Sequence, residues 1–372
     1  MSQENSMGQN SQFIAMDLFA GGGGLTLGLK DAGFRVVGAV EIDDLASETY
    51  EKNHSEVKLW KRDIRSLTGD EVRQTLRLRK GQLDLLAGCP PCQGFSSLTT
   101  MNGSKIVDDP RNSLVWEFVR FVEELQPKAI MLENVPGLAK EADFKAVRCE
   151  LEELGYTVDV QIRNSAKFGV PQRRRRLILL GGRYGQVPFP EEEEGPPITV
   201  RDKIWGLPEP GMSGDPLHDI KEERSPRVRR IMELIPMDGG SRSDLPDDMV
   251  LPCHRRGTGF KDVYGRMAWD AVAPTITSGC INPSKGRFLH PSQPRAITLR
   301  EAALLQGFPA HYWVSLRKGK YAAAVVIGNA LPPEFIRRHA VSVDAYLRRR
   351  SAARRGKRTQ PTPKSSGEQA LV

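Results

Sequence analysis

The chain lacks the sequence features of membrane and secreted proteins. No run of about 18 apolar residues, the length of a membrane-spanning helix, occurs in its 372 residues. The first twelve residues are polar and lack the apolar core of a secretory signal. Cysteine is scarce, and its odd number of five indicates free thiols in a reducing compartment rather than a disulfide framework. We therefore expect a cytoplasmic, globular protein that does not bind membranes.

The chain contains fewer acidic than basic residues, 46 against 54, which gives a formal net charge of +8. Much of the basic excess lies near the C-terminus: Arg348, Arg349, Arg350, Arg354, Arg355, Lys357 and Arg358. We expect residues 351–372, rich in Arg, Lys, Pro, Ser and Gly, to form a disordered basic tail. Two interpretations of the tail stay open, a solvated charged segment or a sequence-independent grip on phosphates.

Apolar runs alternate with segments of helical pattern through the first half of the chain. The expected buried strands are Phe13–Phe19, Arg35–Val40, Leu83–Ala87, Ala129–Leu132, Tyr156–Ile162 and Leu177–Leu180. The expected helices are Leu25–Asp31, Asp44–Asn53, Glu71–Arg79, Ser113–Leu125 and Lys140–Leu154. Repeated strand–helix units indicate an α/β fold built on a parallel sheet with helices on both faces.

The strand–helix alternation stops near Val187. Pro188, Pro190 and the acidic run Glu191–Glu194 mark a boundary, after which Gly, Pro, Arg and His are frequent and apolar runs are short. A helical pattern returns at Leu299–Gln306. We therefore expect a large domain over residues 12–187, a smaller, loop-rich domain over residues 188–298 and a return to the large domain over residues 299–350.

A run of glycines follows the first expected strand, in the segment DLFAGGGG at residues 17–24. Glycines at a strand-to-helix turn let a ligand approach the backbone and the helix N-terminus. Glu41 ends the second strand 20 residues after Gly21, where a carboxylate can hold ribose hydroxyls, and Asp63 follows a short third strand. The pattern is neither a strict GxGxxG fingerprint nor a P-loop. A plain tight turn is the alternative to the nucleoside-containing cofactor that we expect here.

Chemically active residues follow several of the expected strands. Asp17, Glu41, Asp63, Cys92 and Glu133 stand at successive strand ends. The carboxyl edge of an open parallel sheet is where ligands bind, so we expect these side chains to face one cleft. An unpaired buried carboxylate is costly, so Glu133 is not expected to serve packing alone.

Four arginines, Arg173 to Arg176, directly precede the strand Leu177–Leu180. Strand alternation places Arg174 and Arg176 on one side and Arg173 and Arg175 on the other. One pair is expected to converge with Glu133 on a substrate. The alternative is a solvated entrance to the strand.

The segment AGCPPCQGFS places Cys89 and Cys92 on either side of two prolines. A redox CxxC pair usually opens a helix, whereas these prolines and the following Gly94 and Ser96 favour a loop. A zinc site needs two more ligands, for which only the adjacent Cys253 and His254 suggest themselves. A catalytic thiol is the interpretation we favour, and we expect no metal.

These segments, taken in order, resemble the motifs of the C5-cytosine-specific DNA methyltransferases. They stand in the sequence as DLFAGGGGLTLGLKDAG, EID, RDI, PPCQGFS, ENV and QRRRR, followed by TLREAALLQGFP and GNALPP. The resemblance covers roughly residues 12–182 and 290–335, and it is specific because many motifs recur in order at compatible spacings. Val326 and Leu304 depart from the residues usual in the last two motifs. The resemblance implies a Rossmann-like methyltransferase domain and a smaller target-recognition domain.

The resemblance implies S-adenosylmethionine as cofactor. Its implied binding residues are Asp17, Phe19, Gly21, Gly23, Glu41, Ile42, Asp63, Ile64, Leu114 and Asn329. In this scheme Glu41 holds the ribose, Asp63 and Ile64 flank the adenine, and Asn329 closes the pocket beside the methionine end.

The resemblance also implies the catalytic roles. Cys92 is the nucleophile that attacks C6 of a flipped-out cytosine, and Cys89 is a bystander. Glu133 binds N3 and N4 of the base, Arg176 holds the O2 side and Arg174 supports the pocket. Residues 93–111 are expected to close over the base as a mobile loop.

The implied partner is double-stranded DNA, read by the small domain of a monomeric, bacterial enzyme. Candidate DNA contacts are Arg224, Arg227, Arg229, Arg230, His254, Arg255, Arg256, Lys261, Arg266, Lys285 and Arg287. A cognate restriction endonuclease acting separately is expected. The alternatives are a tRNA cytosine-5 methyltransferase and an inert DNA-binding relative; a nicotinamide oxidoreductase would leave the PCQ, ENV and QRRRR segments without a purpose.

Overall fold

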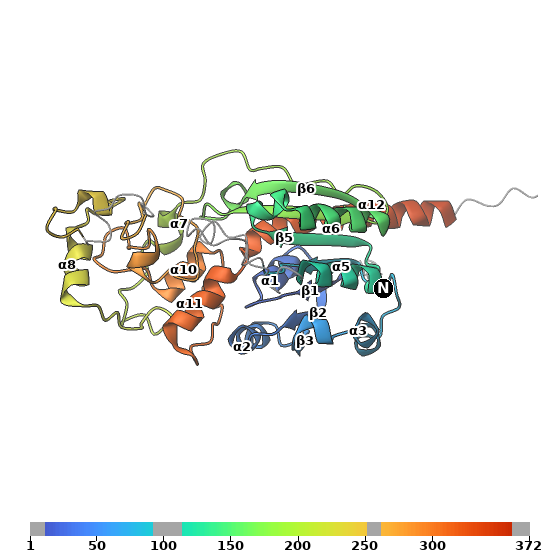
Figure 1. The fold of residues 1–372 in the computed structure, drawn as a ribbon, viewed down its shortest axis with the longest axis horizontal. Coiled ribbons are helices and arrows are strands. Elements are labelled where there is room, and N and C mark those ends of the chain that lie inside the picture. The colour runs from blue at the N-terminus through green and yellow to red at the C-terminus, as the bar shows by residue number, and fades with distance from the viewer. Residues whose placement is uncertain (1–11, 92–113, 251–261, 359–372) are drawn as a thin grey trace, which may run out of the picture.

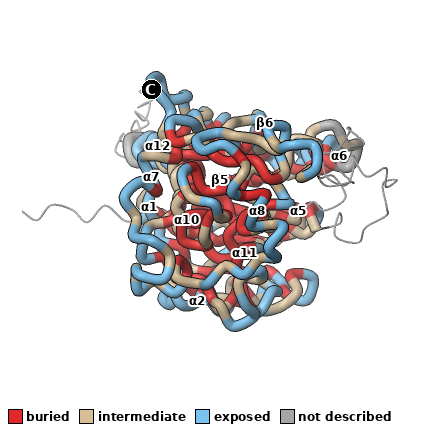
Figure 2. Tube along the Cα trace, turned by 90° about the vertical axis from the view of Figure 1, so that its left-hand side faces the viewer, coloured by how far each residue is buried: buried red, intermediate tan, exposed pale blue. Residues whose placement is uncertain are grey.

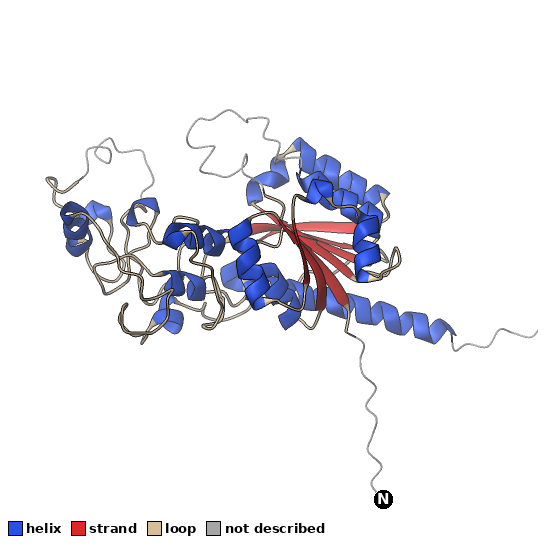
Figure 3. Ribbon diagram, turned by 90° about the horizontal axis from the view of Figure 1, so that it is seen from below, coloured by secondary structure: helices blue, strands red, loops and turns tan. Residues whose placement is uncertain are grey.

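The computed structural model describes residues 12–91, 114–250 and 262–358. Its centre is a seven-stranded sheet in the order β3-β2-β1-β4-β5-β7-β6, with helices on both faces (Figure 1, Figure 3). The strands are β1 Ile14–Leu18, β2 Arg35–Glu41, β3 Lys58–Lys61, β4 Leu85–Gly88, β5 Ala129–Asn134, β6 Thr157–Asn164 and β7 Arg175–Gly182. The α/β fold expected from the alternation of apolar runs and helical segments is confirmed.

The helices fall into two groups: those that cover the sheet, and those between residues 200 and 329. The first group is α1 Gly24–Asp31, α2 Asp44–Asn53, α3 Gly69–Leu76, α5 Leu114–Leu125, α6 Ala142–Glu153 and α12 Pro333–Arg358. The second is α7 Val200–Ile204, α8 Pro226–Leu234, α10 Leu299–Leu305 and α11 Gly319–Asn329. Short 3₁₀ turns are η1 Ile64–Ser66, η4 Pro136–Lys140, η5 Ser165–Lys167, η6 Arg242–Asp244 and η7 Pro283–Lys285.

One strand of the sheet runs against the others, which corrects the expectation of a fully parallel sheet. Strands β1 to β5 pair in parallel, whereas β7 pairs antiparallel with both β5 and β6. Only a short connection that contains η5 joins β6 to β7. A parallel pair needs a crossover of a dozen or more residues, so this connection permits a hairpin instead.

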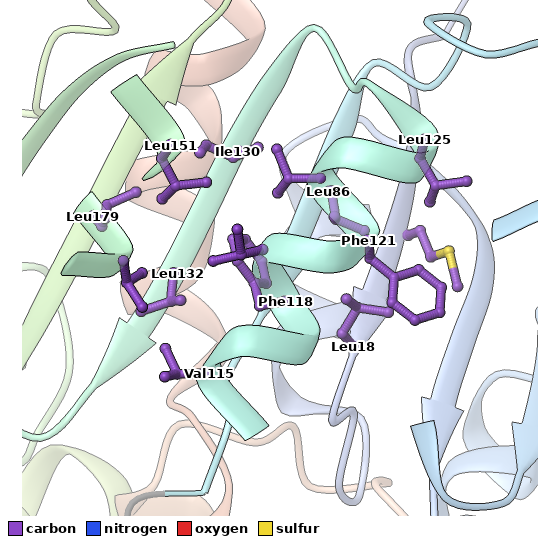
Figure 4. Packing of buried hydrophobic residues seen from close by; sticks show 14 of the residues in the cluster. Leu18, Leu86, Val115, Phe118, Phe121, Leu125, Ile130, Leu132, Leu151 and Leu179 are labelled. Carbon is purple, nitrogen blue, oxygen red and sulfur yellow. The ribbon is translucent and has the colours of Figure 1, made fainter. Parts of the chain in front are cut away.

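Alternate residues of each strand feed two apolar layers, as the two-residue period of a strand requires. Leu86 of β4 and Ile130 of β5 pack with α5 on one face, whereas Leu85 and Met131 pack with α1 and α12 on the other. On the α5 face, Phe118 and its neighbours lie directly over the central strands (Figure 4). The central strands β1, β4 and β5 are buried at every position, which explains why they are mostly apolar, whereas the edge strands β3 and β6 carry polar and exposed residues.

Residues 188–298, here called the small region, contain little regular structure and lie at one end of the sheet (Figure 1). Its buried residues share a core with α10 and α11, and a second small core surrounds Ile231 and Tyr264. Figure 2 shows buried positions running through β5 and α10, with exposed positions on the outside. The small region is therefore a packed body joined to the return segment, not a loose insertion.

The last helix is longer than expected. Helix α12 packs against α1, where Gly28 is in contact with the backbone of Pro333 and with Ile336, and it continues through Arg358. Residues 351–358, for which the sequence analysis expected a disordered tail, continue this helix, and the Ala, Arg and Lys among them favour a helix. Residues 359–372 lie outside the described part of the chain. None of the described helices is long and apolar enough to cross a membrane.

Candidate functional site

The carboxyl ends of β1, β2, β4 and β5 meet at one edge of the sheet because these strands are parallel. The glycine turn, residues 21–24, follows β1 and leads into α1. Glu41 ends β2, and Glu133 stands near the end of β5. The structure thus brings the glycine turn, Glu41 and Glu133 to the edge where open α/β sheets bind ligands.

The glycine turn has a backbone that requires glycine. Phe19, Gly21 and Gly23 have positive φ angles of 63°, 55° and 94°. Gly21 is the only one of its four glycines that is partly exposed, and there is open space where its Cβ would lie. Phe19 has a side chain and still adopts the left-handed conformation, a cost of about 1–2 kcal/mol that surrounding contacts must offset.

Glu41 ties the glycine turn to the end of β2. Its Oε2 accepts a hydrogen bond of 2.7 Å from the Gly21 amide, and Oε1 accepts from the amides of Ile42 and Asp43. Burial raises the pKa of Glu41, and these three amides offset part of the rise. Ile42, next along the chain, is 64% exposed, a large apolar side chain in the open beside a carboxylate.

These features fit a nucleoside cofactor such as S-adenosylmethionine. The open space at Gly21 leaves room for a ligand against the backbone. A carboxylate oxygen accepts through more than one lone pair, so Glu41 can still receive ribose hydroxyls. The exposed Ile42 offers an apolar surface of the kind a purine ring packs on.

Asp17 lies inside the protein, below the glycine turn. It is fully buried, and Oδ2 accepts a hydrogen bond of 2.7 Å from Thr26 Oγ1, which lies 2.8 Å from the Tyr50 hydroxyl. Because the Thr26 proton points to Asp17, Tyr50 must donate to Thr26. Burial raises the pKa of Asp17 to about 7. Its Oδ1 has no hydrogen-bond partner among the described residues, and its cofactor role stays a prediction.

The other expected cofactor residues lie in different surroundings. Asp63 follows β3 and pairs with Arg65, which donates to it from its amide and its guanidinium. Ile64 is buried, whereas Asn329 at the end of α11 is exposed. Leu114 begins α5 and is half-buried against the core below the edge.

A compact cluster of charged and polar side chains lies where β4, β5 and β7 meet. We call it the strand-end cluster, and it consists of Cys89, Glu133, Arg174 and Arg176. The Nε atom of Arg176 lies 2.8 Å from Oε1 of Glu133, whose side chain is 2% exposed. The ion pair is close, but no aligned hydrogen bond reaches Oε1 among the described residues, so this oxygen retains an acceptor position.

Cys89 is the unexpected member of this cluster. Its thiol donates a 2.7 Å hydrogen bond to Oε2 of Glu133. Burial, followed by the carboxylate of Glu133, raises the thiol pKa well above its usual value, so Cys89 keeps its proton near neutral pH. Cys89 is therefore a hydrogen-bond donor to Glu133 and unsuited to act as a thiolate nucleophile. Cys92, the expected nucleophile, lies outside the described residues.

The alternation expected for Arg173 to Arg176, the last two of which begin β7, is confirmed. Arg173 and Arg175 are exposed, while Arg174 is buried and Arg176 is half-buried. Arg174 donates to the backbone carbonyls of Ile276 and Gly328, and burial lowers its pKa to about 9. It therefore joins the large domain to the small region and to the end of α11.

Two residues of this edge had no assigned role in the sequence analysis. Asn134 donates from Nδ2 to the carbonyl of Pro90, and so holds the segment that leads to Cys92. Gln172 is fully buried; it donates to Gln306 Oε1 and accepts from the amide of Ile276. The available signals were their positions directly after Glu133 and directly before the arginines.

The candidate DNA contacts divide by their surroundings. Arg227, Arg229 and Arg230 on α8 are exposed, as is Lys285. Arg266 is fully buried, so its assignment as a DNA contact is wrong. Arg224 and Arg287 are engaged with carbonyl and carboxylate oxygens of the small region. His254, Arg255, Arg256 and Lys261 lie outside the described residues, as do Cys253 and residues 93–111.

Comparison with known sequences assigns a family. The family profile described as C-5 cytosine-specific DNA methylase matches residues 13–344. Type II methylase M.HgiDII of Herpetosiphon aurantiacus is 36% identical over 346 residues, which cover 89% of this chain and 95% of that protein. Type II methyltransferase M1.BsuMI of Bacillus subtilis is 33% identical over 335 residues, which cover 85% of this chain and 77% of that protein.

Solved structures agree with the fold. A crystal structure of an E. coli prophage-encoded protein, assigned as a DNA modification methyltransferase, matches with a TM-score of 0.67 at 26% identity. The match covers 91% of this chain and all of that chain. The S. pombe Dnmt2 methyltransferase matches with a TM-score of 0.60 at 18% identity, over 91% of this chain and 99% of its own. At that identity the second match speaks for the fold alone.

Proposed function

The chain belongs to the C-5 cytosine-specific DNA methylase family, and from this premise we propose that it methylates C5 of a cytosine within a specific sequence of double-stranded DNA. The observation that carries the proposal is the strand-end cluster, in which Glu133 lies between Arg176 and Cys89. This cluster lies at the same sheet edge as the glycine turn and Glu41, which fit the cofactor. Base-holding and cofactor-holding groups are thereby neighbours.

The proposed reaction begins with the thiolate of Cys92 adding to C6 of the base. The addition breaks the C5–C6 double bond and gives C5 carbanion character, so that C5 can take a methyl group. S-adenosylmethionine would supply that methyl group from its sulfonium and leave as S-adenosylhomocysteine, which keeps the electrons of the broken carbon–sulfur bond. Water then takes the C5 proton, the C5–C6 double bond re-forms, and the C6–S bond breaks so that Cys92 leaves as a thiolate.

Glu133 is proposed to hold the edge of the cytosine ring at N3 and N4. The N4 amino group can donate to Oε1, which has an acceptor position left. N3 is an acceptor, so its contact with Oε2 needs a proton between the two atoms, once the Cys89 thiol has moved aside. Arg176 keeps the carboxylate in place and offers a cation to the O2 side of the base. Arg174 keeps the floor of the pocket fixed through its two carbonyl contacts.

A base in a stacked duplex cannot reach these buried groups, since Glu133 is 2% exposed. We therefore propose that the target cytosine is flipped out of the helix, at a cost of a few kcal/mol. The exposed arginines of α8 and Lys285 offer the small region positive charge for phosphate contacts. The relatives' names, Type II methylase and Type II methyltransferase, support the modification half of a restriction system. A nuclease as a separate protein is part of the proposal. The family profile, which is that of a DNA methylase, favours DNA over the tRNA alternative.

Bisulfite sequencing of DNA from cells that express the protein tests the activity and reports the recognised sequence. Protection of one cytosine in a fixed context is the expected result. Unmodified DNA, together with methylation of tRNA by the purified protein, would move the proposal to the tRNA branch.

The covalent step is tested by a duplex with 5-fluorocytosine at the target. We expect a protein–DNA adduct that survives denaturation, because the fluorine cannot leave as the C5 proton does. Cys92→Ser is expected to abolish both the adduct and turnover, while the matched control Cys89→Ser keeps turnover within about fivefold because a hydroxyl still donates to Glu133. If only Cys89→Ser lost the adduct, the nucleophile would be Cys89, and the proposed role of Cys92 would be wrong.

A further inference from the structure

The back of the glycine turn is held by residues that arrive from elsewhere in the chain. The Tyr312 hydroxyl lies 2.7 Å from the Gly22 carbonyl oxygen, and His54 Nε2 lies 3.2 Å from the Gly23 carbonyl oxygen. A Cβ atom on Gly23 would lie 2.6 Å from both side chains. The two side chains therefore fill the space beside Gly23, whereas the space beside Gly21 is open.

The directions of these hydrogen bonds follow from the charge of each group. The Lys30 ammonium lies 3.2 Å from His54 Nδ1, and an ammonium can only donate, so Nδ1 accepts and Nε2 carries the proton. Burial, followed by the charge of Lys30, lowers the pKa of His54 to about 4, so the ring is neutral at pH 7. Burial also raises the pKa of Tyr312, which keeps its hydroxyl proton.

Both donors therefore point at the turn. Nε2–H of His54 donates to the Gly23 carbonyl and lies 3.0 Å from the Tyr312 oxygen, which in turn donates to the Gly22 carbonyl. Both carbonyls are buried with their glycines. The Gly23 carbonyl also accepts from the Leu27 amide, whereas the Tyr312 hydroxyl is the one donor to the Gly22 carbonyl among the described residues. Without that hydroxyl the Gly22 carbonyl would be left unpaired in the interior, and the turn would have to shift to reach another donor.

Tyr312 is itself fixed by two parts of the molecule. Its carbonyl accepts from Arg300, the side chain of which pairs with Asp215 in the small region. The next residue, Trp313, exchanges two hydrogen bonds with the side chain of Asn53 on α2. The tyrosine hydroxyl is therefore presented to the turn from a rigid support that extends into the small region.

We infer that Tyr312 and His54 are positioning residues for the cofactor, which hold the glycine turn in the shape that accepts S-adenosylmethionine. The inference rests on the proposed function, because it takes that cofactor as the ligand of the turn. Neither side chain contacts the open side of the turn, so both act through the backbone of Gly22 and Gly23.

Tyr312→Phe tests the inference, because it removes the hydroxyl and keeps the ring packed against Phe308. The full-length protein is titrated with S-adenosylhomocysteine in a calorimeter, without turnover. We expect the dissociation constant to rise about five- to thirtyfold, the effect of losing one or two buried hydrogen bonds. In methylation assays the KM for S-adenosylmethionine should rise by the same factor, while kcat at saturating cofactor and the affinity for DNA stay within twofold.

Tyr321→Phe is the matched control, since Tyr321 is 53% exposed on α11 and its substitution should leave the dissociation constant unchanged. His54→Gln and His54→Leu provide a second pair should Tyr312→Phe fold poorly. Glutamine retains an N–H donor and should restore most of the affinity that leucine loses.

An unchanged dissociation constant in Tyr312→Phe and in His54→Leu would overturn the inference. A fall in kcat at saturating cofactor without a change in affinity would overturn it as well. If the unaltered protein failed to bind S-adenosylhomocysteine, the proposed cofactor itself would be wrong, and the inference would fall with it.

Discussion

The small region and the edge of the sheet each bury one arginine, and the protein uses the two side chains differently. Arg266 of the small region is fully buried, and burial lowers its pKa to about 10. All three of its guanidinium nitrogens donate to backbone carbonyls, those of Met232, Ile235, Pro236, His290 and Gln293. Arg174 at the sheet edge donates to two carbonyls, and its Nε has no partner among the described residues.

The neighbours of the two arginines differ as much as their bonds. Five carbonyl oxygens surround Arg266, whereas Arg174 lies in the field of Arg176, Glu133 and Cys89. A buried cation with every donor satisfied holds a fold together. A buried cation with an unpaired N–H among other charges lowers the stability of the folded protein, and packing alone does not require it. Residues of this kind concentrate at functional sites. Arg266 is therefore expected to serve the fold, and Arg174 the proposed chemistry.

The largest expected effect is that of Arg266→Met. The substitution leaves four carbonyls of the small region without a donor, because only the Gln293 carbonyl also accepts from a backbone amide, that of Arg295. We expect a loss of about 3–5 kcal/mol in the free energy of unfolding. Hydrogen exchange should show residues 226–296 losing protection while the strands of the sheet keep theirs. Arg229→Met, on the exposed face of α8, is the control and should change stability by less than about 0.5 kcal/mol. A change of less than about 0.5 kcal/mol in Arg266→Met would contradict the claim that Arg266 stabilises the small region.

Arg174→Met should affect turnover more than stability. We expect kcat to fall about a hundredfold, because the pocket floor and the field around Glu133 both change. The loss of stability should be about 1–3 kcal/mol, less than for Arg266, since fewer carbonyls lose their donor. Arg173→Met, exposed on the same segment, is the control. Equal kcat values in the two variants, measured on the recognised duplex, would contradict a functional role for Arg174.

Asp17, like Arg174, is buried and has one polar atom, Oδ1, without a hydrogen-bond partner among the described residues. An acid whose pKa is raised in the folded state binds its proton more tightly there than in the unfolded chain. Its contribution to stability is therefore present at low pH and is lost as pH rises towards about 7. Relative to Asp17→Asn, we expect the unaltered protein to lose about 2 kcal/mol of stability between pH 5 and pH 8.

Urea unfolding of both proteins at several pH values measures this difference. Buried His54, His290 and His339, whose pKa values burial lowers to about 4, act in the opposite direction below pH 6.5 in both proteins. Their effect cancels in the difference. Parallel curves for the two proteins would show that Asp17 is ionised throughout.

The smallest expected effect is that of His339→Leu. This substitution tests whether an unpaired buried atom is by itself enough to mark a functional residue. His339 Nε2 also has no partner among the described residues, but its ring lies between Phe168, Phe189 and Phe335, outside the strand-end cluster. We expect stability to change by less than about 1 kcal/mol and kcat to stay within twofold. His339 Nδ1 donates to the Phe335 carbonyl, so Nε2 of the neutral ring is an unpaired acceptor. A large fall in kcat would show that an unpaired buried nitrogen outside the strand-end cluster can mark function.

Local pattern predicted much of the fold. The predicted runs became β1, β2, β4, β5, β6 and β7. Strands buried on both faces, such as β4 and β5, need continuous apolar side chains, whereas the edge strand β6 alternates apolar and polar residues. The alternation of Arg173 to Arg176 was also predictable, since it depends only on the two-residue period of a strand. The reversal of β7 was missed because the apolar pattern of a strand carries no information about its direction.

The candidate site was predicted unevenly. The strand-end position of Glu133 followed from the motif order, and its ion pair with Arg176 agrees with the expected convergence. The burial of Arg266 and the contact of Cys89 with Glu133 were not predicted. A basic residue in a loop-rich region reads as surface, and the residue that receives a thiol proton is 44 positions away.

The sequence by itself determined which residues form strands and helices, and the order in which the motifs follow one another. Both depend on short periods and on turn chemistry, which act within a few residues. Only the tertiary structure decided which arginine is a support and which lies at the site, and that Tyr312 reaches the Gly22 carbonyl 290 positions away. Such contacts depend on desolvation and on hydrogen-bond partners from distant segments, and these exist only once the sheet and the small region have packed together.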